Sequence, residues 1–113
     1  MSECIFCKIA AGEIPAKLLY QDDEMLAFHD IKPAAPVHFL VIPRAHIASC
    51  AELSEAHAPL VGRMLVKASE LAREQGLNEG FRTIINTGRI GGQEVYHLHI
   101  HVLGGSQPLG APF

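Results

Sequence analysis

The sequence predicts an α+β fold, in which a five-stranded antiparallel sheet is accompanied by one long and one short helix. Short β-rich segments come first, one long amphipathic helix follows them, and further β-rich segments end the chain. Strands and helices do not alternate, as the crossovers of a parallel sheet would require. At 113 residues, 49% apolar and 19% charged, the chain has the size of one packed domain, which we expect to span residues 1–113.

The first half of the chain predicts a short helix and three strands. Residues 3–11 predict the helix, because Gly12 and Pro15 mark its end. Apolar, β-branched and aromatic residues are enriched in three segments that predict strands: 18–21, 25–30 and 37–43. The stretch KPAAP at 32–36 separates the last two, because prolines fix φ and restrict the residues before them.

The long helix is predicted from Ser54 to Gln75. Ser54 suits an N-cap, and Gly76 suits the position just after a helix. Apolar side chains recur at helical spacing between these ends: Leu60, Met64, Ala68, Leu71 and Ala72. Residues 81–88 predict the fourth strand, and a glycine-rich loop leads into VYHLHIHVLGG at 95–105, which predicts the fifth.

Charge and hydropathy exclude several classes of protein. The formal net charge is −3 and the pI about 6.1, so the chain lacks the basic surface that binds nucleic acid. No apolar run approaches the ~20 residues that cross a bilayer, and the first residues lack signal-peptide features, so we expect no membrane partner. Cys4 and Cys7 lie too close together to suggest a disulfide framework, which indicates a cytoplasmic location.

Three histidines alternate with apolar residues in the run YHLHIHV. On a strand, His97, His99 and His101 would share one face. The residues between and beside them would form the opposite, core-facing side: Tyr96, Leu98, Ile100 and Val102. Neighbouring histidines would lie about 6.6 Å apart at Cα and the outer two about 13 Å apart, so a pair suits one metal ion better than all three. Imidazole is also the natural nucleophile or acid–base group near pH 7.

This run fits the pattern of the histidine-triad superfamily, His-Leu-His-Ile-His-Val-Leu at 97–103. Together with VHFLVIPRAH at 37–46, FHDI at 28–31 and GGQEVYHLHIHVLGG at 91–105, it makes the chain resemble the Hint branch of nucleotide-binding proteins, the purine nucleoside phosphoramidases. The resemblance runs from about residue 4 to residue 105. It implies the α+β fold described above, continued across a homodimer into one larger sheet.

The resemblance also implies a reaction. Family members cleave purine nucleoside 5′-phosphoramidates, or acyl- and aminoacyl-adenylates, at the α-phosphorus through a covalent nucleotidyl-histidine. His99 matches the nucleophile, oriented by the backbone carbonyl of His97. His101 matches the histidine that contacts the phosphate, and it pairs with His38. The implied partner is a purine nucleotide such as AMP or a nucleoside phosphoramidate.

Further residues match the nucleotide-binding positions of the family. Asp30 matches the carboxylate that accepts hydrogen bonds from the ribose hydroxyls. The wall around base and sugar is matched by Phe28, His29 and Ile31, and the phosphate side by Asn86, Gly92, Gln93 and Glu94. Glu94 departs from many relatives, which carry a serine that aids proton delivery to the leaving amine, so the leaving-group preference stays open.

Cys4 and Cys7 form a C-x-x-C motif, and two histidines could complete a tetrahedral Cys2His2 zinc site. Some bacterial members of the family have such a site, and its ligands match Cys4, Cys7, His46 and His97. Structural zinc is therefore the implied cofactor, and we expect no organic cofactor. The alternative is that both cysteines are simply small buried apolar residues.

Residues and resemblance together favour a purine nucleotide-binding hydrolase. One alternative is a dinucleoside polyphosphate hydrolase, as in a sister branch of the superfamily. Another is a nucleotide-binding or scaffolding protein in which catalysis is incidental. The three differ in substrate and in the need for turnover, so direct assays separate them.

Overall fold

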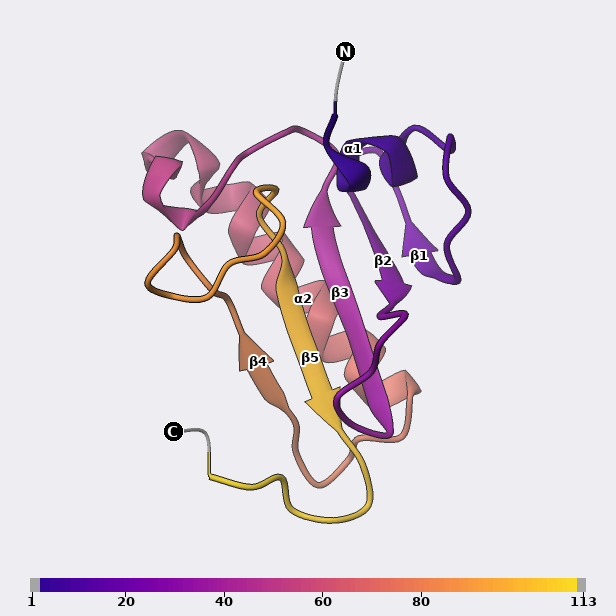
Figure 1. Ribbon diagram of the computed structural model, residues 1–113. Helices are drawn as coiled ribbons and strands as arrows, with labels where there is room; N and C mark the ends of the chain where they lie inside the picture. The colour runs from indigo at the N-terminus through magenta and orange to yellow at the C-terminus, as the bar shows by residue number, and fades with distance from the viewer. Residues whose placement is uncertain (1–2, 112–113) are drawn as a thin grey trace.

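The computed structural model describes residues 3–111 and confirms the predicted α+β fold (Figure 1). Five strands form one antiparallel sheet: β1 (Leu18–Gln21), β2 (Met25–His29), β3 (Val37–Pro43), β4 (Arg82–Ile84) and β5 (Ile100–Gly104). Their order across the sheet is β1-β2-β3-β5-β4, so β3 is central and β1 and β4 are the edges. The two α-helices are α1 (Ile5–Ala10) and α2 (Ala58–Glu74).

The two faces of the sheet carry different cores. Because side chains alternate along a strand, Phe39 and Val41 of β3 face α2, while Leu40 and Ile42 point to the opposite side. Figure 1 shows α2 crossing behind the sheet, where its apolar stripe closes the larger core. The smaller core on the other face is closed by Phe6 of α1. That thinner side of the sheet holds the functional residues.

Helix α2 begins later than its sequence predicted. Residues 55–57 form a 3₁₀ turn after Ser54, and the α-helix then starts at Ala58 with Pro59 in its first turn. Proline is favoured at this position because its missing N–H would have no acceptor within the helix. The predicted end is confirmed, since Gly76 follows the helix with φ 89°. Within residues 3–111, neither helix has the length and apolarity needed to cross a membrane.

The fifth strand is shorter than the histidine pattern predicted. Strand β5 begins at Ile100, so the prediction that His97 and His99 lie on it is wrong. The N–H of Leu98 donates to the carbonyl of Ile47, in the loop after β3, at 2.7 Å. This bond ties the histidine segment to that loop before the chain enters the sheet.

Burial in the histidine segment follows the prediction only in part. Three of the four residues expected on the core side are buried: Leu98, Ile100 and Val102. Tyr96 is 47% exposed, because the chain bends at 95–97 and has not yet taken up strand geometry. Strand β4 is also shorter than the predicted 81–88 and spans only Arg82–Ile84.

Candidate functional site

A pocket of about 490 Å³ opens on the face of the sheet that carries α1. Its walls come from α1, from β2 and the loop after it, from β3, from the segment after β4, and from residues before and within β5. Three of the four predicted catalytic histidines line it, namely His38, His99 and His101. The volume suits a small-molecule ligand.

His99 stands in this pocket just before β5 and is 7% exposed. Its Nδ1 lies 2.7 Å from the backbone carbonyl of His97. A carbonyl can only accept, so Nδ1 carries a proton, and in the neutral tautomer Nε2 keeps its lone pair. The Phe6 and His99 rings pack edge to face, with ring centroids 5.1 Å apart. His99 is thus held through its Nδ1–H, and in the neutral ring Nε2 is the bare nitrogen that a nucleophile needs.

His38 and His101 form a hydrogen-bonded pair beside His99. The N–H of Ala34 donates to Nδ1 of His38 at 3.0 Å, so the proton of this ring sits on Nε2. His38 Nε2 lies 3.0 Å from His101 Nδ1 and 3.5 Å from a carboxylate oxygen of Asp30. His38 therefore donates to His101, whose own proton is placed on Nε2. A pocket-lining Nε2–H of this kind can donate to an anionic oxygen.

Burial, together with the neighbouring His99 and His38, lowers the pKa of His101 from 6.5 to about 4, against an opposing effect of Asp30. Burial also lowers the pKa of His38, again opposed by Asp30. Both imidazoles are therefore neutral at pH 7 in the free protein. An anion bound against them would favour the protonated form.

This depressed pKa predicts a pH dependence of stability. Between about pH 6.5 and about pH 4 the unfolded chain binds a proton at His101 that the folded protein does not, so acidification lowers the free energy of unfolding. We expect the loss between pH 7 and pH 5, measured by urea denaturation without nucleotide, to be smaller in His101→Gln than in the wild type. Equal losses in the two proteins would contradict this origin.

Six of the eight predicted nucleotide-binding residues line the pocket: Phe28, Asp30, Ile31, Asn86, Gly92 and Glu94. His29 does not. It follows Phe28 on β2 and pairs with Phe39, whose side chain faces α2, so the alternation of the strand turns His29 to the far side of the sheet. The predicted role of His29 therefore has no counterpart in the pocket lining.

Gln93 is 7% exposed and does not line the pocket. Its Oε1 accepts from the Gly88 N–H at 2.9 Å, and its Nε2 donates to the carbonyls of Ala48 at 2.8 Å and Val95 at 3.0 Å. These bonds brace the glycine-rich loop from inside. The neighbouring Gly92 has φ 80°, a conformation that favours glycine and leaves its backbone open to the pocket.

Part of the lining was missed by sequence reasoning: Ile5, Phe6, Ile9, Lys32, Leu40 and Val95. The α1 residues were missed because nothing local shows that the N-terminal helix folds back onto His99. One signal was available, since Phe6 lies between Cys4 and Cys7 in the sequence. Once both cysteines are placed beside His97, Phe6 is brought close to His99.

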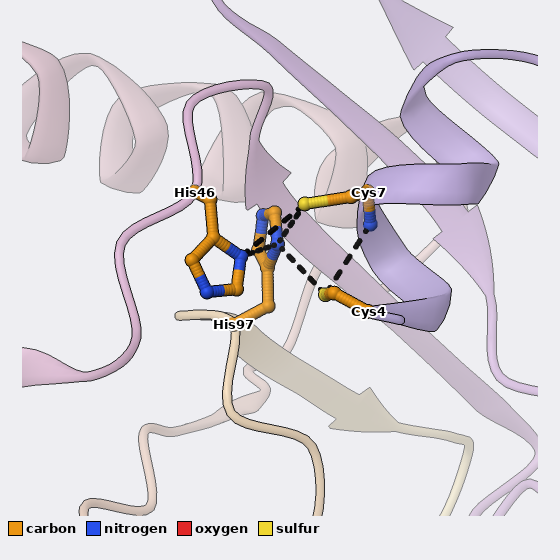
Figure 2. Close-up of side chains that lie close together, drawn as sticks. All are labelled: Cys4, Cys7, His46 and His97. Atoms are coloured by element: carbon orange, nitrogen blue, oxygen red, sulfur yellow. Dashed lines mark hydrogen bonds between the residues drawn. The ribbon is translucent and has the colours of Figure 1, made fainter. Parts of the chain in front are cut away.

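The four predicted metal ligands meet at one point next to this pocket. Figure 2 shows Cys4 at the N-cap of α1, Cys7 in its first turn, His46 on the loop after β3, and His97 on the segment that leads to β5. Their ligand atoms all lie within 4.8 Å of one another. His46 Nδ1 and His97 Nδ1 are 3.3 Å apart, and Cys7 Sγ lies 3.2 Å and 3.5 Å from these two nitrogens. Cys4 Sγ lies 3.4 Å from His97 Nδ1.

These spacings fit a tetrahedral zinc ion. Ordinary zinc–nitrogen and zinc–sulfur bonds place ligand atoms about 3.3 Å (N to N) and about 3.6 Å (N to S) apart. The ring of His97 is also prepared for such a bond, because its Nε2 lies 2.8 Å from the carbonyl of Pro43 and must carry the proton. Nδ1 is then bare and faces the thiols. Burial, the largest influence, lowers the pKa of His97 and favours its neutral, metal-binding form.

A second group with ligand chemistry, formed by Asp30, His38 and His101, fits an ion less well. Its ligand atoms also lie within 4.8 Å of one another. However, the Ala34 N–H occupies Nδ1 of His38, so Nε2 carries a proton where an ion would need a lone pair. A metal there would force two N–H groups to face each other. This group is better suited to a hydrogen-bond relay.

Comparison with known proteins places this geometry in a family. Over residues 3–111 the chain matches the family model described as "Scavenger mRNA decapping enzyme C-term binding". Protein HitA of Neisseria gonorrhoeae is 57% identical over 104 residues, which cover 92% of this chain and 97% of that protein. A solved HIT family hydrolase from Legionella pneumophila Philadelphia 1 is 46% identical with a TM-score of 0.94, covering 98% of this chain and 100% of the other.

Two further solved structures are named for their ligands. The histidine triad nucleotide-binding protein from Candida albicans is 31% identical with a TM-score of 0.80, covering 98% of this chain and 87% of the other. A zinc-bound histidine triad family protein from Mycobacterium smegmatis is 33% identical with a TM-score of 0.78, covering 89% of this chain and 73% of the other. Likeness of this extent, in sequence and in structure, establishes that the chain belongs to the histidine-triad (HIT) family, the family of the solved hydrolase that it matches.

Proposed function

We propose that this protein is a purine nucleotide-binding hydrolase that cleaves nucleoside 5′-phosphoramidates, or acyl- and aminoacyl-adenylates, at the α-phosphorus. The observation that carries the proposal is the bond of His99 Nδ1 to the His97 carbonyl, at 2.7 Å. It leaves Nε2 as a lone pair inside a pocket of about 490 Å³. The name of the Candida albicans relative supports a nucleotide ligand.

The reaction consists of two displacements at phosphorus. His99 Nε2 attacks the α-phosphorus and a nitrogen–phosphorus bond to the enzyme forms. The bond to the leaving group breaks: an amine takes up a proton from solvent water as it leaves, whereas the carboxylate of an acyl-adenylate leaves as the anion. Water then attacks the same phosphorus, releases His99 and gives up a proton, so that the nucleoside monophosphate leaves. His101 Nε2–H donates to a non-bridging oxygen in both steps, and His38 holds His101 in this tautomer.

The rest of the pocket provides complementary nucleotide contacts. Asp30 Oδ1 accepts from the Lys32 N–H at 2.7 Å, which orients the carboxylate and leaves Oδ2 to accept from ribose hydroxyls. Phe28 and Ile31 provide apolar walls for the base and sugar, and Ile31 is 91% exposed before any ligand covers it. Asn86 and the backbone of Gly92 lie on the phosphate side. His29, on the far side of the sheet, has no part in this proposal.

The charges around the pocket favour a substrate with a single phosphate. Among the described residues the lining offers the lysine ammonium of Lys32 and the two carboxylates of Asp30 and Glu94, and no arginine. A polyphosphate leaving group would bring several further negative charges with little to compensate them. An amine leaving group adds no negative charge, and a protonated amine is attracted by a carboxylate. Dinucleoside polyphosphate hydrolysis is therefore the second candidate.

Substrate comparison tests this proposal directly. We expect kcat/KM for adenosine 5′-phosphoramidate to exceed that for a diadenosine polyphosphate by about 100-fold or more, because only the second substrate opposes the carboxylates. Release of AMP, followed by chromatography, measures both rates. A Glu94→Gln variant should narrow the ratio. Faster cleavage of the dinucleotide would reverse the assignment, and no cleavage of either would favour the scaffolding alternative.

We propose zinc as the metal of the Cys4, Cys7, His46 and His97 cluster, supported by the spacings given above and by the zinc-bound relative. When bound, zinc would supply a structural cross-link among α1, the loop after β3 and the segment before β5. All four positions would be taken by protein atoms, which leaves none open for substrate. A homodimer joined through the edges of the sheet stays a prediction.

A further inference from the structure

Helix α1 belongs to both sites. Cys4, at its N-cap, and Cys7, in its first turn, contribute to the metal cluster, while Phe6 lies between them and lines the nucleotide pocket. The Phe6 ring meets His99 edge to face at 5.1 Å and His97 at 5.9 Å between centroids. It also packs on Phe28 at 5.5 Å. The N-cap and first turn of α1 therefore carry the two metal ligands and part of the pocket wall.

Helix α1 is too short to be stable without contacts that fix it to the rest of the protein. It is six residues long, whereas isolated helices in water need about 12–15 residues before they become even marginally stable. Anchors other than the cluster are also present: Phe6 is only 7% exposed in the smaller core, Ile9 packs against the same core, and Arg44 donates to the carbonyl of Ala10 at 2.7 Å. Metal bonds to Cys4 and Cys7 would add two stronger ones.

His97 provides a second link between the sites. Its ring faces the thiols of α1 through Nδ1, and its backbone carbonyl holds Nδ1 of His99. Any shift of the His97 ring on metal binding would therefore also move the backbone carbonyl of the same residue, which orients His99. Phe6 touches both rings, so the helix and the histidine segment are packed into one unit.

We propose that metal binding at the cluster and nucleotide binding in the pocket are energetically coupled, with Phe6 of α1 as the contact that transmits the coupling. The proposal rests on the proposed function, because it takes a purine nucleotide as the pocket ligand. When a metal already holds α1 in place, nucleotide binding loses less conformational entropy, because the α1 wall of the pocket is already ordered. By thermodynamic reciprocity, a bound nucleotide must raise the affinity for the metal by the same factor.

Zinc affinity measured with and without nucleotide tests the coupling. We expect saturating AMP to lower the zinc dissociation constant of the whole protein about tenfold, in competition with a chromophoric chelator. A blank titration of chelator and AMP corrects for the weak binding of zinc by AMP itself. In Phe6→Leu, which keeps an apolar side chain without the ring, the effect should fall below about threefold.

Lys8→Ala is the matched control on the same helix. Lys8 is no part of the cluster and does not line the pocket, so this variant should keep the wild-type coupling. If calorimetry shows that AMP binds and the zinc affinity is unchanged, the coupling is refuted while the proposed function stands. If AMP does not bind the metal-loaded protein, the proposed function fails first. Full coupling in Phe6→Leu would refute the route through α1.

Discussion

His99→Ala is expected to slow the hydrolysis of adenosine 5′-phosphoramidate by roughly four orders of magnitude or more. The wild-type ring presents a bare Nε2 in the pocket because its Nδ1 proton is held by the His97 carbonyl at 2.7 Å. Among the described residues that line the pocket, no other side chain combines this tautomer with this position. AMP affinity should change little, since the base and ribose contacts remain. Chromatography of released AMP gives the rate, and calorimetry gives the affinity.

The covalent intermediate makes this test more specific. A reaction stopped in base should show a nucleotidyl adduct on His99 by mass spectrometry in the wild type and no adduct in the variant. His57→Ala is a suitable control, because His57 accepts from the Ser54 N–H at 3.0 Å at the start of α2 and does not line the pocket. An adduct on any other residue, or wild-type turnover in His99→Ala, would disprove the assignment.

Cys7→Ser is expected to abolish zinc binding and to lower the thermal midpoint by on the order of 10–15 °C. Cys7 Sγ lies between the two imidazoles, 3.2 Å from His46 Nδ1 and 3.5 Å from His97 Nδ1. Zinc at about 1,000 times its dissociation constant stabilises the folded state by about 4 kcal/mol, and this contribution is lost with the ligand. Metal analysis of protein purified without added metal should find one zinc per wild-type chain.

Cys50→Ser is the control for this variant. Cys50 is half-buried and no part of the cluster, so the same chemical change should leave zinc content and thermal midpoint near their wild-type values. His38→Asn should also retain its zinc, because the Asp30, His38 and His101 group lacks the free lone pair that an ion needs. Absence of zinc from the wild-type protein, or an unchanged thermal midpoint in Cys7→Ser, would refute the structural zinc site.

Much of the site could be predicted because many of its residues belong to short, regular sequence motifs. The alternation of His97, His99 and His101 and the spacing of Cys4 and Cys7 are visible in the sequence, and the family resemblance added His38 and His46. The structure brings these residues together in two clusters. The succession of strands and helices along the chain followed from apolar segments and prolines, which act locally, whereas the order of strands across the sheet was not predicted.

What could not be predicted depends on contacts between distant segments. The strand reading of residues 96–99 was wrong because Leu98 binds the carbonyl of Ile47, a partner that periodicity cannot reveal. Gln93 was expected at the phosphate, yet its amide is used within the loop by Gly88, Ala48 and Val95. In each case a distant backbone carbonyl, that of Ile47 or of Ala48, binds a residue whose local pattern suggested another use.

Other backbone groups fix the tautomers of three histidines in the two clusters. The proton positions on His97, His99 and His38 are set by the carbonyl of Pro43, the carbonyl of His97 and the N–H of Ala34. None of these three partners is a side-chain group, so none is deleted when a residue is exchanged for another that keeps the same backbone. Surrounding side chains can therefore drift and retune substrate choice, while the pattern of donors and lone pairs is inherited with the path of the chain.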